Sequence, residues 1–248
     1  MPSLNDVKLQ IAGVGKTKQI TKAMGMVASA KLRGAQNRIE RFRPYAEKFG
    51  EMLGELASRT EEAAHPLLQV HEQPKTALIV LLSADRGLCG GFNVNLITKA
   101  LSLAKEKEAE GMTVRFICVG RKGRDAVRKT SFEMIESYGD VMGSFDFRLA
   151  ARLGGRVAQL YESGEADEVY LVYSEFVSVA RQVPTKMALL PVASAKADEE
   201  QSGAAAECLY EPEVGTLLAE LLPRYVNVQI YRGLLDNSAS ENAARMAS

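Results

Sequence analysis

Residues 76 to 93 read TALIVLLSADRGLCGGFN, and this stretch predicts the centre of the fold. Its first eight residues form a short continuous apolar run, which is typical of a strand buried on both faces of a sheet. A glycine-rich turn follows, and Asn95 to Glu110 then has the pattern of a helix. A buried strand, a tight turn and a helix in this order predict the first unit of a parallel α/β sheet.

The same alternation of strand and helix continues along the chain. Short apolar runs predict strands at 113–120 and 132–139, and amphipathic stretches predict helices at 121–130 and 147–164. Residues 167–179 and 181–192 predict two strands joined by a hairpin, with Pro184 and Pro191 at edge positions. Together these elements predict an open, Rossmann-like α/β sheet with mainly parallel strands.

Long helices are predicted at both ends of the chain. Apolar or small residues recur from Leu4 to Leu56 at spacings of three and four, which is typical of a helix that shares a narrow seam with another helix. Val214 to Met246 repeats this spacing, so the two helices are predicted to form an antiparallel coiled coil. Six glycines and Pro44 would weaken the first helix, so we expect a partner to hold it throughout and its small residues to allow close backbone approach.

These patterns divide the chain into four parts. They are an N-terminal helix at 1–59, a linker at 60–75, the Rossmann-like domain at 76–208 and a C-terminal helix at 209–248. The linker is inferred from Pro66 and Pro74 and from both histidines, His65 and His71. We expect the two histidines to be solvated.

The charge of the chain is zero overall but unevenly distributed. Nine Lys or Arg residues lie between residues 8 and 43 against a single acid, whereas residues 198 to 220 carry seven acids and no base. The basic helix predicts an acidic partner, either nucleic acid or an acidic protein surface. No run of eighteen apolar residues and no signal segment occurs, so we expect a cytosolic chain or one anchored only by its partners.

Two glycine-containing motifs raise the question of nucleotide binding. GKT at 15–17 matches the end of a phosphate-binding loop, but Gln10 stands where the first glycine is required and the preceding segment is helical. In the turn after the first strand, Gly87, Gly90 and Gly91 do not have the G-x-G-x-x-G spacing. Neither motif therefore predicts a nucleotide site.

The turn itself is interpreted as a tight strand-to-helix connection in which Asp85 and Arg86 satisfy each other or the backbone. Its Cys89 would need a base and an orienting group to act as a nucleophile, and neither histidine lies in a stretch predicted to be structured. The three cysteines, Cys89, Cys118 and Cys208, have no metal-binding spacing and are predicted to be mostly buried thiols. No catalytic, metal or cofactor site is predicted.

Five segments resemble the gamma subunit of the F-type ATP synthase, in the order and spacing of that family. They are ITKAMGMVASAKLRGAQ (Ile20 to Gln36), RPYAEK (Arg43 to Lys48), SADRGLCGGFN (Ser83 to Asn93), LYEPE (Leu209 to Glu213) and QIYRGLLDNSASENAARM (Gln229 to Met246). The resemblance implies a non-catalytic rotor shaft in the central stalk, without a cofactor or a bound nucleotide. Its terminal helices would pair inside a hexamer of alternating alpha and beta subunits and drive the catalytic beta sites through their conformations in turn.

The resemblance also implies partners and contact positions. The alpha and beta subunits, the epsilon subunit and the membrane-embedded, proton-carrying c-ring would be the partners, at the cytoplasmic face of a bacterial inner membrane. The implied contacts are Lys22, Met24, Lys31 and Arg33 with the acidic loops of the catalytic subunits, Asp85, Arg86 and Cys89 with the lower edge of the hexamer, and Leu209, Tyr210 and Glu211 with the c-ring.

Two departures from the family pattern are visible. Gly25 stands where the family has a charged residue, and the family's C-terminal helix continues past the position of Met246. We therefore expect the N-terminal helix to extend beyond its partner.

Two other readings remain open on residues alone. A basic coiled coil that binds nucleic acid would use the N-terminal helix, and a Rossmann-like enzyme would use the sheet. Each leaves part of the chain unexplained.

Overall fold

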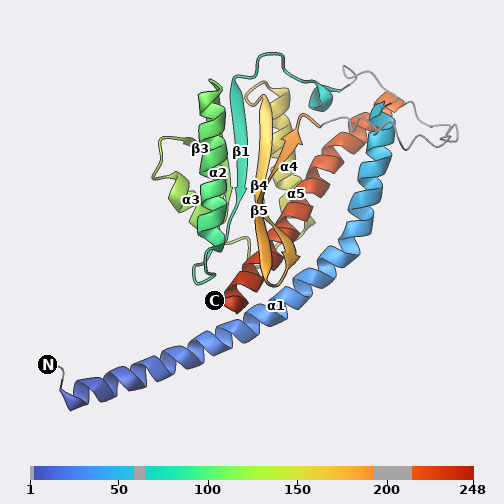
Figure 1. The fold of residues 1–248 in the computed structure, drawn as a ribbon. Coiled ribbons are helices and arrows are strands. Elements are labelled where there is room, and N and C mark those ends of the chain that lie inside the picture. The colour runs from blue at the N-terminus through green and yellow to red at the C-terminus, as the bar shows by residue number, and fades with distance from the viewer. Residues whose placement is uncertain (1–2, 59–64, 193–213) are drawn as a thin grey trace.

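The computed structural model describes residues 3–58, 65–192 and 214–248, and it confirms an α/β sheet flanked by long terminal helices (Figure 1). In chain order the elements are α1 (Leu4–Ser58), η2 (Pro66–Leu68), β1 (Thr76–Leu82), α2 (Phe92–Ala109), β2 (Thr113–Val119), α3 (Arg121–Val127), β3 (Glu133–Tyr138), α4 (Phe147–Glu162), β4 (Glu168–Ser178), β5 (Arg181–Leu190) and α5 (Val214–Ala247). The predicted strands and helices of the sheet domain all overlap observed ones, and their ends differ by up to three residues.

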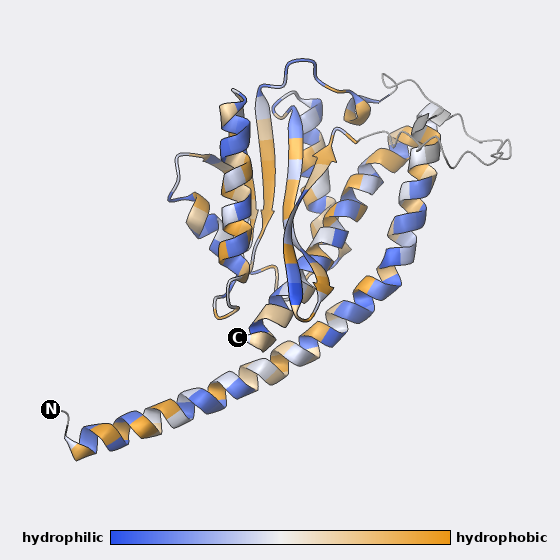
Figure 2. Cartoon of the chain, viewed as in Figure 1, coloured by the Kyte–Doolittle hydropathy of each residue, from blue (hydrophilic) through white to orange (hydrophobic). Residues whose placement is uncertain are grey.

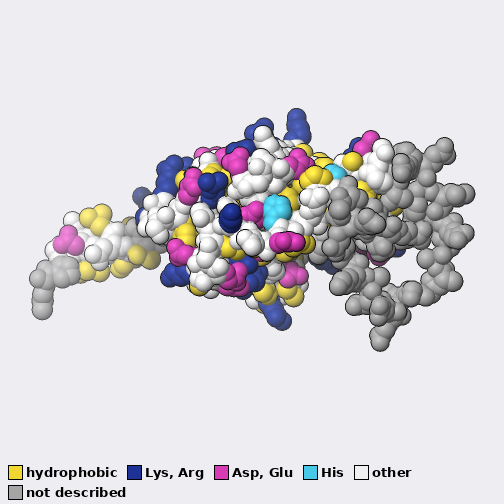
Figure 3. Space-filling view, turned by 90° about the horizontal axis from the view of Figure 1, so that it is seen from above, with side chains coloured by type: hydrophobic (Ala, Val, Ile, Leu, Met, Phe, Trp, Pro, Cys, Tyr) yellow, Lys and Arg dark blue, Asp and Glu magenta, His cyan; other side chains and the backbone are white. Residues whose placement is uncertain are grey.

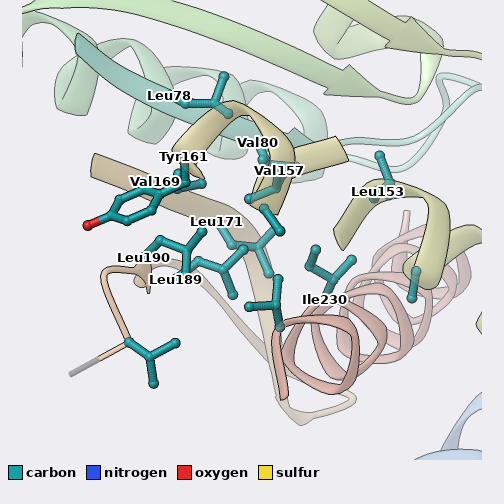
Figure 4. Close-up of a cluster of buried hydrophobic side chains, with 14 of the residues drawn as sticks. Leu78, Val80, Leu153, Val157, Tyr161, Val169, Leu171, Leu189, Leu190 and Ile230 are labelled. Carbon is teal, nitrogen blue, oxygen red and sulfur yellow. The ribbon is translucent and has the colours of Figure 1, made fainter. Parts of the chain in front are cut away.

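The five strands lie in the order β3-β2-β1-β4-β5. β1 is central and pairs in parallel with β2 and β4, whereas β5 is an antiparallel edge strand. Alternate residues of β1 face two apolar layers: Leu78 and Val80 pack with α4 and α5 (Figure 4), and Ile79 packs with α2. Burial on both faces explains why β1 reads as an unbroken apolar run. Pro184 lies in the edge strand, as predicted.

Helix α5 is buried on two opposite sides. Leu222, Val226 and Ile230 belong to the core formed with the sheet and α4, whereas Val228 and Ala239 pack against α1. The sequence predicted only the second of these faces. The C-terminal helix is therefore part of the core of the sheet domain and also one of the two helices of the α1–α5 pair.

Polar residues of α5 complete the hydrogen bonding of β4 beyond the end of β1. Asn237 Oδ1 accepts from the backbone N–H of Ser174 at 3.2 Å, and Ser240 Oγ donates to the Ser174 carbonyl at 3.0 Å. Asn237 and Ser240 are fully buried. Since an unpaired buried backbone group is costly, these side chains take the place of a neighbouring strand.

The antiparallel pairing of α1 with α5 is present along the second half of α1. Leu32 and Ala35 pack with Ala239 and Ala243, and nearer the other end Phe49 packs with Val228. Increasing residue numbers on α1 thus meet decreasing numbers on α5. An aromatic contact supports the seam, because the ring centroids of Phe42 and Tyr231 lie 4.9 Å apart in an edge-to-face arrangement.

The first part of α1 projects away from the rest of the chain (Figures 1 and 3). The predicted seam residues Leu4, Ile11 and Val14 are 77%, 67% and 69% exposed, and apolar residues recur along this arm (Figure 2). Within this chain α5 therefore covers only the second part of α1, as expected for a helix that extends beyond its partner helix, and the expectation that a partner holds α1 throughout stays a prediction.

The glycines of α1 do not provide close backbone contacts. A Cβ atom added at Gly13, Gly15, Gly25, Gly34 or Gly50 would meet nothing within 4 Å. Within this chain these five glycines therefore mediate no close backbone approach, and close approach of a partner subunit at them stays a prediction. By contrast, a Cβ at Gly233 of α5 would lie 2.7 Å from Leu171 Cδ2, so α5 approaches the sheet closely at this glycine.

The two histidines are half-buried and make specific contacts, so the expectation that they are solvated holds only in part. His65 Nδ1 accepts from the backbone N–H of Leu67 at the start of η2. His71 Nδ1 lies 2.5 Å from Asp167 Oδ1, and its ring stacks on Tyr161. Asp167 also accepts from the backbone N–H groups of Lys75 and Thr76, so this cluster ties the segment before β1 to β4.

The α1–α5 seam contains a buried carboxyl group. Asp236 is 5% exposed and lines a small pocket with Phe42 and Arg43 of α1. Burial raises the pKa of Asp236 to about 6; Arg232 and Arg43 oppose this rise, and Glu175 adds to it. The seam therefore holds a carboxyl group that takes up a proton at a higher pH than an exposed aspartate does.

Replacing Gly50 with Ala should raise the free energy of unfolding by up to about 1 kcal/mol, because the methyl group fits and Ala favours helix. Gly233→Ala should lower it by about 1–3 kcal/mol, because the added Cβ clashes with Leu171. Urea unfolding of both variants measures the difference. Equal effects in the same direction would contradict this account of the glycines.

Asp236→Asn should stabilise the chain at pH 7 by up to about 3 kcal/mol, the equivalent of a pKa raised by about two units. The folded state holds the Asp236 proton more tightly than the unfolded state does. The stability that Asp236 contributes is therefore fully present below about pH 4 and is lost as the pH rises through about 6. Thermal unfolding at pH 4 and pH 7 should show a difference between the two proteins mainly at pH 7, with the exposed Asp140→Asn as control.

Candidate partner-contact groove

The β1–α2 turn, residues 83–91, is held from several sides. Asn93 Oδ1 accepts from the backbone N–H of Ala84, and Asn93 Nδ2 donates to the carbonyl of Arg86 and to Cys89 Sγ. Arg245 of α5 donates to the Gly87 carbonyl at 2.6 Å. Two side chains therefore hold this turn: Asn93 in α2, the helix that follows it, and Arg245 in α5.

Asp85 is the acceptor that joins three loops at the carboxyl edge of the sheet. Its Oδ1 accepts from the backbone N–H groups of Arg121 and Asp140 at 3.1 and 2.8 Å, and its Oδ2 accepts from that of Met142 at 3.0 Å. The expectation that Asp85 satisfies the backbone is confirmed, but its donors lie in the β2–α3 and β3–α4 connections. Because the carboxylate already accepts three hydrogen bonds from this chain, its main role is to hold these segments together.

The first amides of α3 are also bonded to the β1–α2 turn. Gly123 donates to Ser83 Oγ at 2.8 Å, and Lys122 donates to the Ala84 carbonyl at 3.1 Å. A Cβ at Gly120, whose φ is +95°, would lie 2.1 Å from the Ser83 carbonyl oxygen. In dinucleotide-binding sheets, backbone amides at a helix start hold phosphate groups. Here the amides at the start of α3 hold the protein's own turn.

Cys89 is buried beneath the turn rather than presented at the surface. It is 1% exposed, and burial raises the pKa of its thiol, with Arg245 opposing the rise. Burial likewise raises the pKa of Cys118 to about 12. The predicted burial of these two thiols is confirmed, and a thiol that resists ionisation is a poor nucleophile. Cys208 lies outside the described residues.

A groove of about 760 Å³ lies between α1, the β1–α2 turn, the β3–α4 loop (residues 139–146) and the last turns of α5. It brings together four residues that the family resemblance implied as contacts: Met24, Lys31, Asp85 and Arg86. Lys22 and Arg33 are exposed on α1 but do not line the groove. Leu209, Tyr210 and Glu211 lie outside the described residues.

The groove combines an apolar floor with positive charge. Met24, Val27 and Phe145 contribute apolar surface, and neither Lys31 nor Arg86 has an ion-pair partner among the described residues. Arg245 is instead paired with Glu241 at 2.6 Å, and burial raises the pKa of Glu241 against the effect of this pair. The unpaired charges of the groove are therefore mainly cationic, which favours an acidic partner.

Several groove residues were not identified from the sequence. Arg38 lies over the Phe145 ring at 5.4 Å, and Arg245 fixes the turn. Arg38 was counted only as part of the basic helix, and Arg245 only as part of the last matched segment. The β3–α4 loop carried no recognisable pattern, because its place in the groove depends on Asp85, which is more than fifty residues away in sequence.

The comparisons with known proteins identify the family. The family model described as ATP synthase matches residues 3–248. The ATP synthase gamma chain of Nitratidesulfovibrio vulgaris (strain Hildenborough) is 64% identical over 248 residues, which cover 100% of this chain and 85% of that relative. The chain belongs to the ATP synthase gamma chain family. The gamma chain of Lawsonia intracellularis is 51% identical, with 100% and 86% coverage.

Solved structures agree with this assignment. A chain in the central stalk and c-ring structure of the Tetrahymena thermophila mitochondrial ATP synthase is similar with a TM-score of 0.67 and 26% identity, covering 92% of this chain and 96% of that one. A Euglena gracilis mitochondrial rotor chain shares the fold at a TM-score of 0.50 and 18% identity.

As a gamma chain, this protein is a central-stalk subunit of ATP synthase, and the expected rotor role is confirmed. The catalytic sites of that complex lie in its beta subunits. The complex is membrane-associated, and none of the gamma chain helices described here is long and apolar enough to cross a membrane. The comparisons give the nucleic-acid-binding reading no support.

Asp85→Ala should lower the free energy of unfolding by about 2 kcal/mol, because three backbone N–H groups lose their acceptor. Hydrogen exchange at Arg121, Asp140 and Met142 should become faster in the same variant. Asp140→Asn is the matched control, since asparagine suits the left-handed backbone at this position and the side chain is mostly exposed and ion-paired with Arg121. Equal changes in both variants would contradict the fastening role of Asp85.

Proposed function

We propose that the groove is the surface through which this rotor subunit contacts acidic loops of the alpha and beta subunits. The observation that carries the proposal is that Lys31 of α1 and Arg86 of the β1–α2 turn line one groove, both without an ion-pair partner among the described residues. Met24 and Val27 of α1 line the same groove. An acidic loop with apolar side chains would match both properties.

The position of the groove suggests how rotation acts on the catalytic sites. It lies on one side of the chain, where α1 leaves the sheet domain, so a ring of similar subunits would meet it one at a time as the chain turns. A contact made at one angle only stabilises one conformation of the facing subunit, because a ligand shifts an equilibrium by its difference in affinity for the two states. Rotation would then move that conformation around the ring, in synthesis or in hydrolysis.

The remaining expectations about partners stay with this proposal. We place the projecting arm of α1 within the alpha–beta ring and the 209–213 segment, with Leu209, Tyr210 and Glu211, against the c-ring, with the epsilon subunit as a further partner. The complex would lie at the cytoplasmic face of a bacterial inner membrane. The division of the chain at 59/60, 75/76 and 208/209 also stays a prediction.

The test is reconstitution with alpha and beta subunits from the same source, followed by magnesium-dependent ATP hydrolysis. The double variant Lys31→Glu with Arg86→Glu should reduce turnover of the purified complex about tenfold, since it places like charges against the acidic loops. The matched control is Lys105→Glu with Lys129→Glu, which makes the same charge change at exposed positions outside the groove.

Three results are distinguishable. Loss of turnover in the groove variant alone supports the proposal. Equal turnover in both double variants would show that the groove does not carry the contact. Failure of the wild-type chain to form any complex with alpha and beta subunits would contradict the proposed partners themselves.

A further inference from the structure

Leu88, in the β1–α2 turn, is the most unusual apolar residue at the surface of the sheet domain. Its φ is +59°, in the left-handed region, where a side chain is strained. Among the described non-glycine residues only Asp140 shares this property, and aspartate tolerates it better than leucine. Leu88 is also 77% exposed, so burial within this chain does not compensate for the strain.

The rest of the turn explains how this conformation is enforced. Asp85 is fixed by three backbone amides, the Arg86 carbonyl by Asn93, and the Gly87 carbonyl by Arg245. On the other side of Leu88, the Cys89 side chain is buried in the layer beneath α2. The backbone is therefore held on both sides of Leu88. Its exposed side chain makes no packing within this chain that would compensate for the strain of the left-handed backbone.

The surroundings of Leu88 indicate the chemistry of a partner. Arg86, two residues earlier, is exposed and lines the groove, and the Lys122 side chain reaches to within about 4 Å of the position a Cβ would take at Gly87. An apolar tip between two cations fits an apolar socket bordered by carboxylates. A rigid side chain that loses little freedom on docking is the kind of residue that anchors an interface.

We propose that Leu88 is a preformed anchor that inserts into an apolar, carboxylate-rimmed socket on the alpha–beta ring, with Asp85 and Arg245 as the positioning residues that hold it there. This inference rests on the proposed function, since it uses the same partner, but it assigns a residue outside the groove lining. The hydrogen bonds of the turn hold the strained conformation in the free chain, so Leu88 can dock without first being ordered.

The proposal makes stability and binding change in opposite directions. Leu88→Gly removes the left-handed strain together with the side chain, so the isolated chain should unfold at a higher temperature. In an equimolar competition with the wild type for a limiting amount of purified alpha–beta complex, the variant should be about tenfold under-represented in the assembled product. Mass spectrometry of the purified complex gives the ratio.

Two further variants make the result specific. Leu88→Asn also suits the left-handed conformation and should show the same pair of changes, which guards against an effect of chain flexibility from glycine. Val70→Ala is the control, because Val70 is 69% exposed but lies before β1, at the other edge of the sheet. It should compete equally with the wild type.

Each outcome decides the question. Higher thermal stability with tenfold weaker competition in both Leu88 variants supports the anchor. Equal competition by the Leu88 variants, while Lys31→Glu with Arg86→Glu still competes poorly, would overturn the anchor and leave the proposed function standing. If the wild type itself does not assemble with the alpha–beta complex, both the proposed function and the anchor are overturned.

Discussion

The structure depends on the burial of α5 between α1 and the sheet. One face of this helix fills the core above β1 and β4, and the other forms the seam with α1. Gly233 permits the approach to the sheet, and Asn237 and Ser240 complete the hydrogen bonds of Ser174 where β1 has ended. Helix α5 packs against both α1 and the sheet. A turn of α1 therefore carries the sheet domain with it, unless the packing of α5 is disrupted. For a subunit that transmits torque, this shared helix is a rigid joint.

The carboxyl edge of the sheet shows how a nucleotide-binding type of sheet serves another purpose. The turns after β1, β2 and β3 converge there, as they do in sheets that bind ligands at this edge. In this chain Asp85 and Ser83 instead accept hydrogen bonds from backbone amides at the start of α3 and so join two of these turns. The edge is thereby converted into a firm support for the groove between the sheet domain and α1.

The candidate site could be predicted only in part, because it is assembled from distant segments. Met24, Lys31 and Arg86 were accessible through the resemblance of their segments to a family, and the positive charge of α1 was visible in composition. The sequence did not show that Asp85 would bind the amides of Asp140 and Met142, since backbone donors have no residue-type signature. It also did not show that Leu88 has a left-handed backbone, because leucine gives no signal for that conformation.

The sequence by itself determined the elements and their order. The apolar run of β1, the edge position of Pro184 and the threes and fours of α1 and α5 are local patterns, and local patterns fix periodicity and burial. Tertiary structure decided what each face meets. The stripe of α1 has the same spacing before and after Ala28, and only the folded structure shows that its second part packs against Ala239 and Ala243 of α5. Likewise only the structure shows that the second apolar face of α5 packs against the sheet. A helical pattern indicates which residues are buried but not which surface covers them.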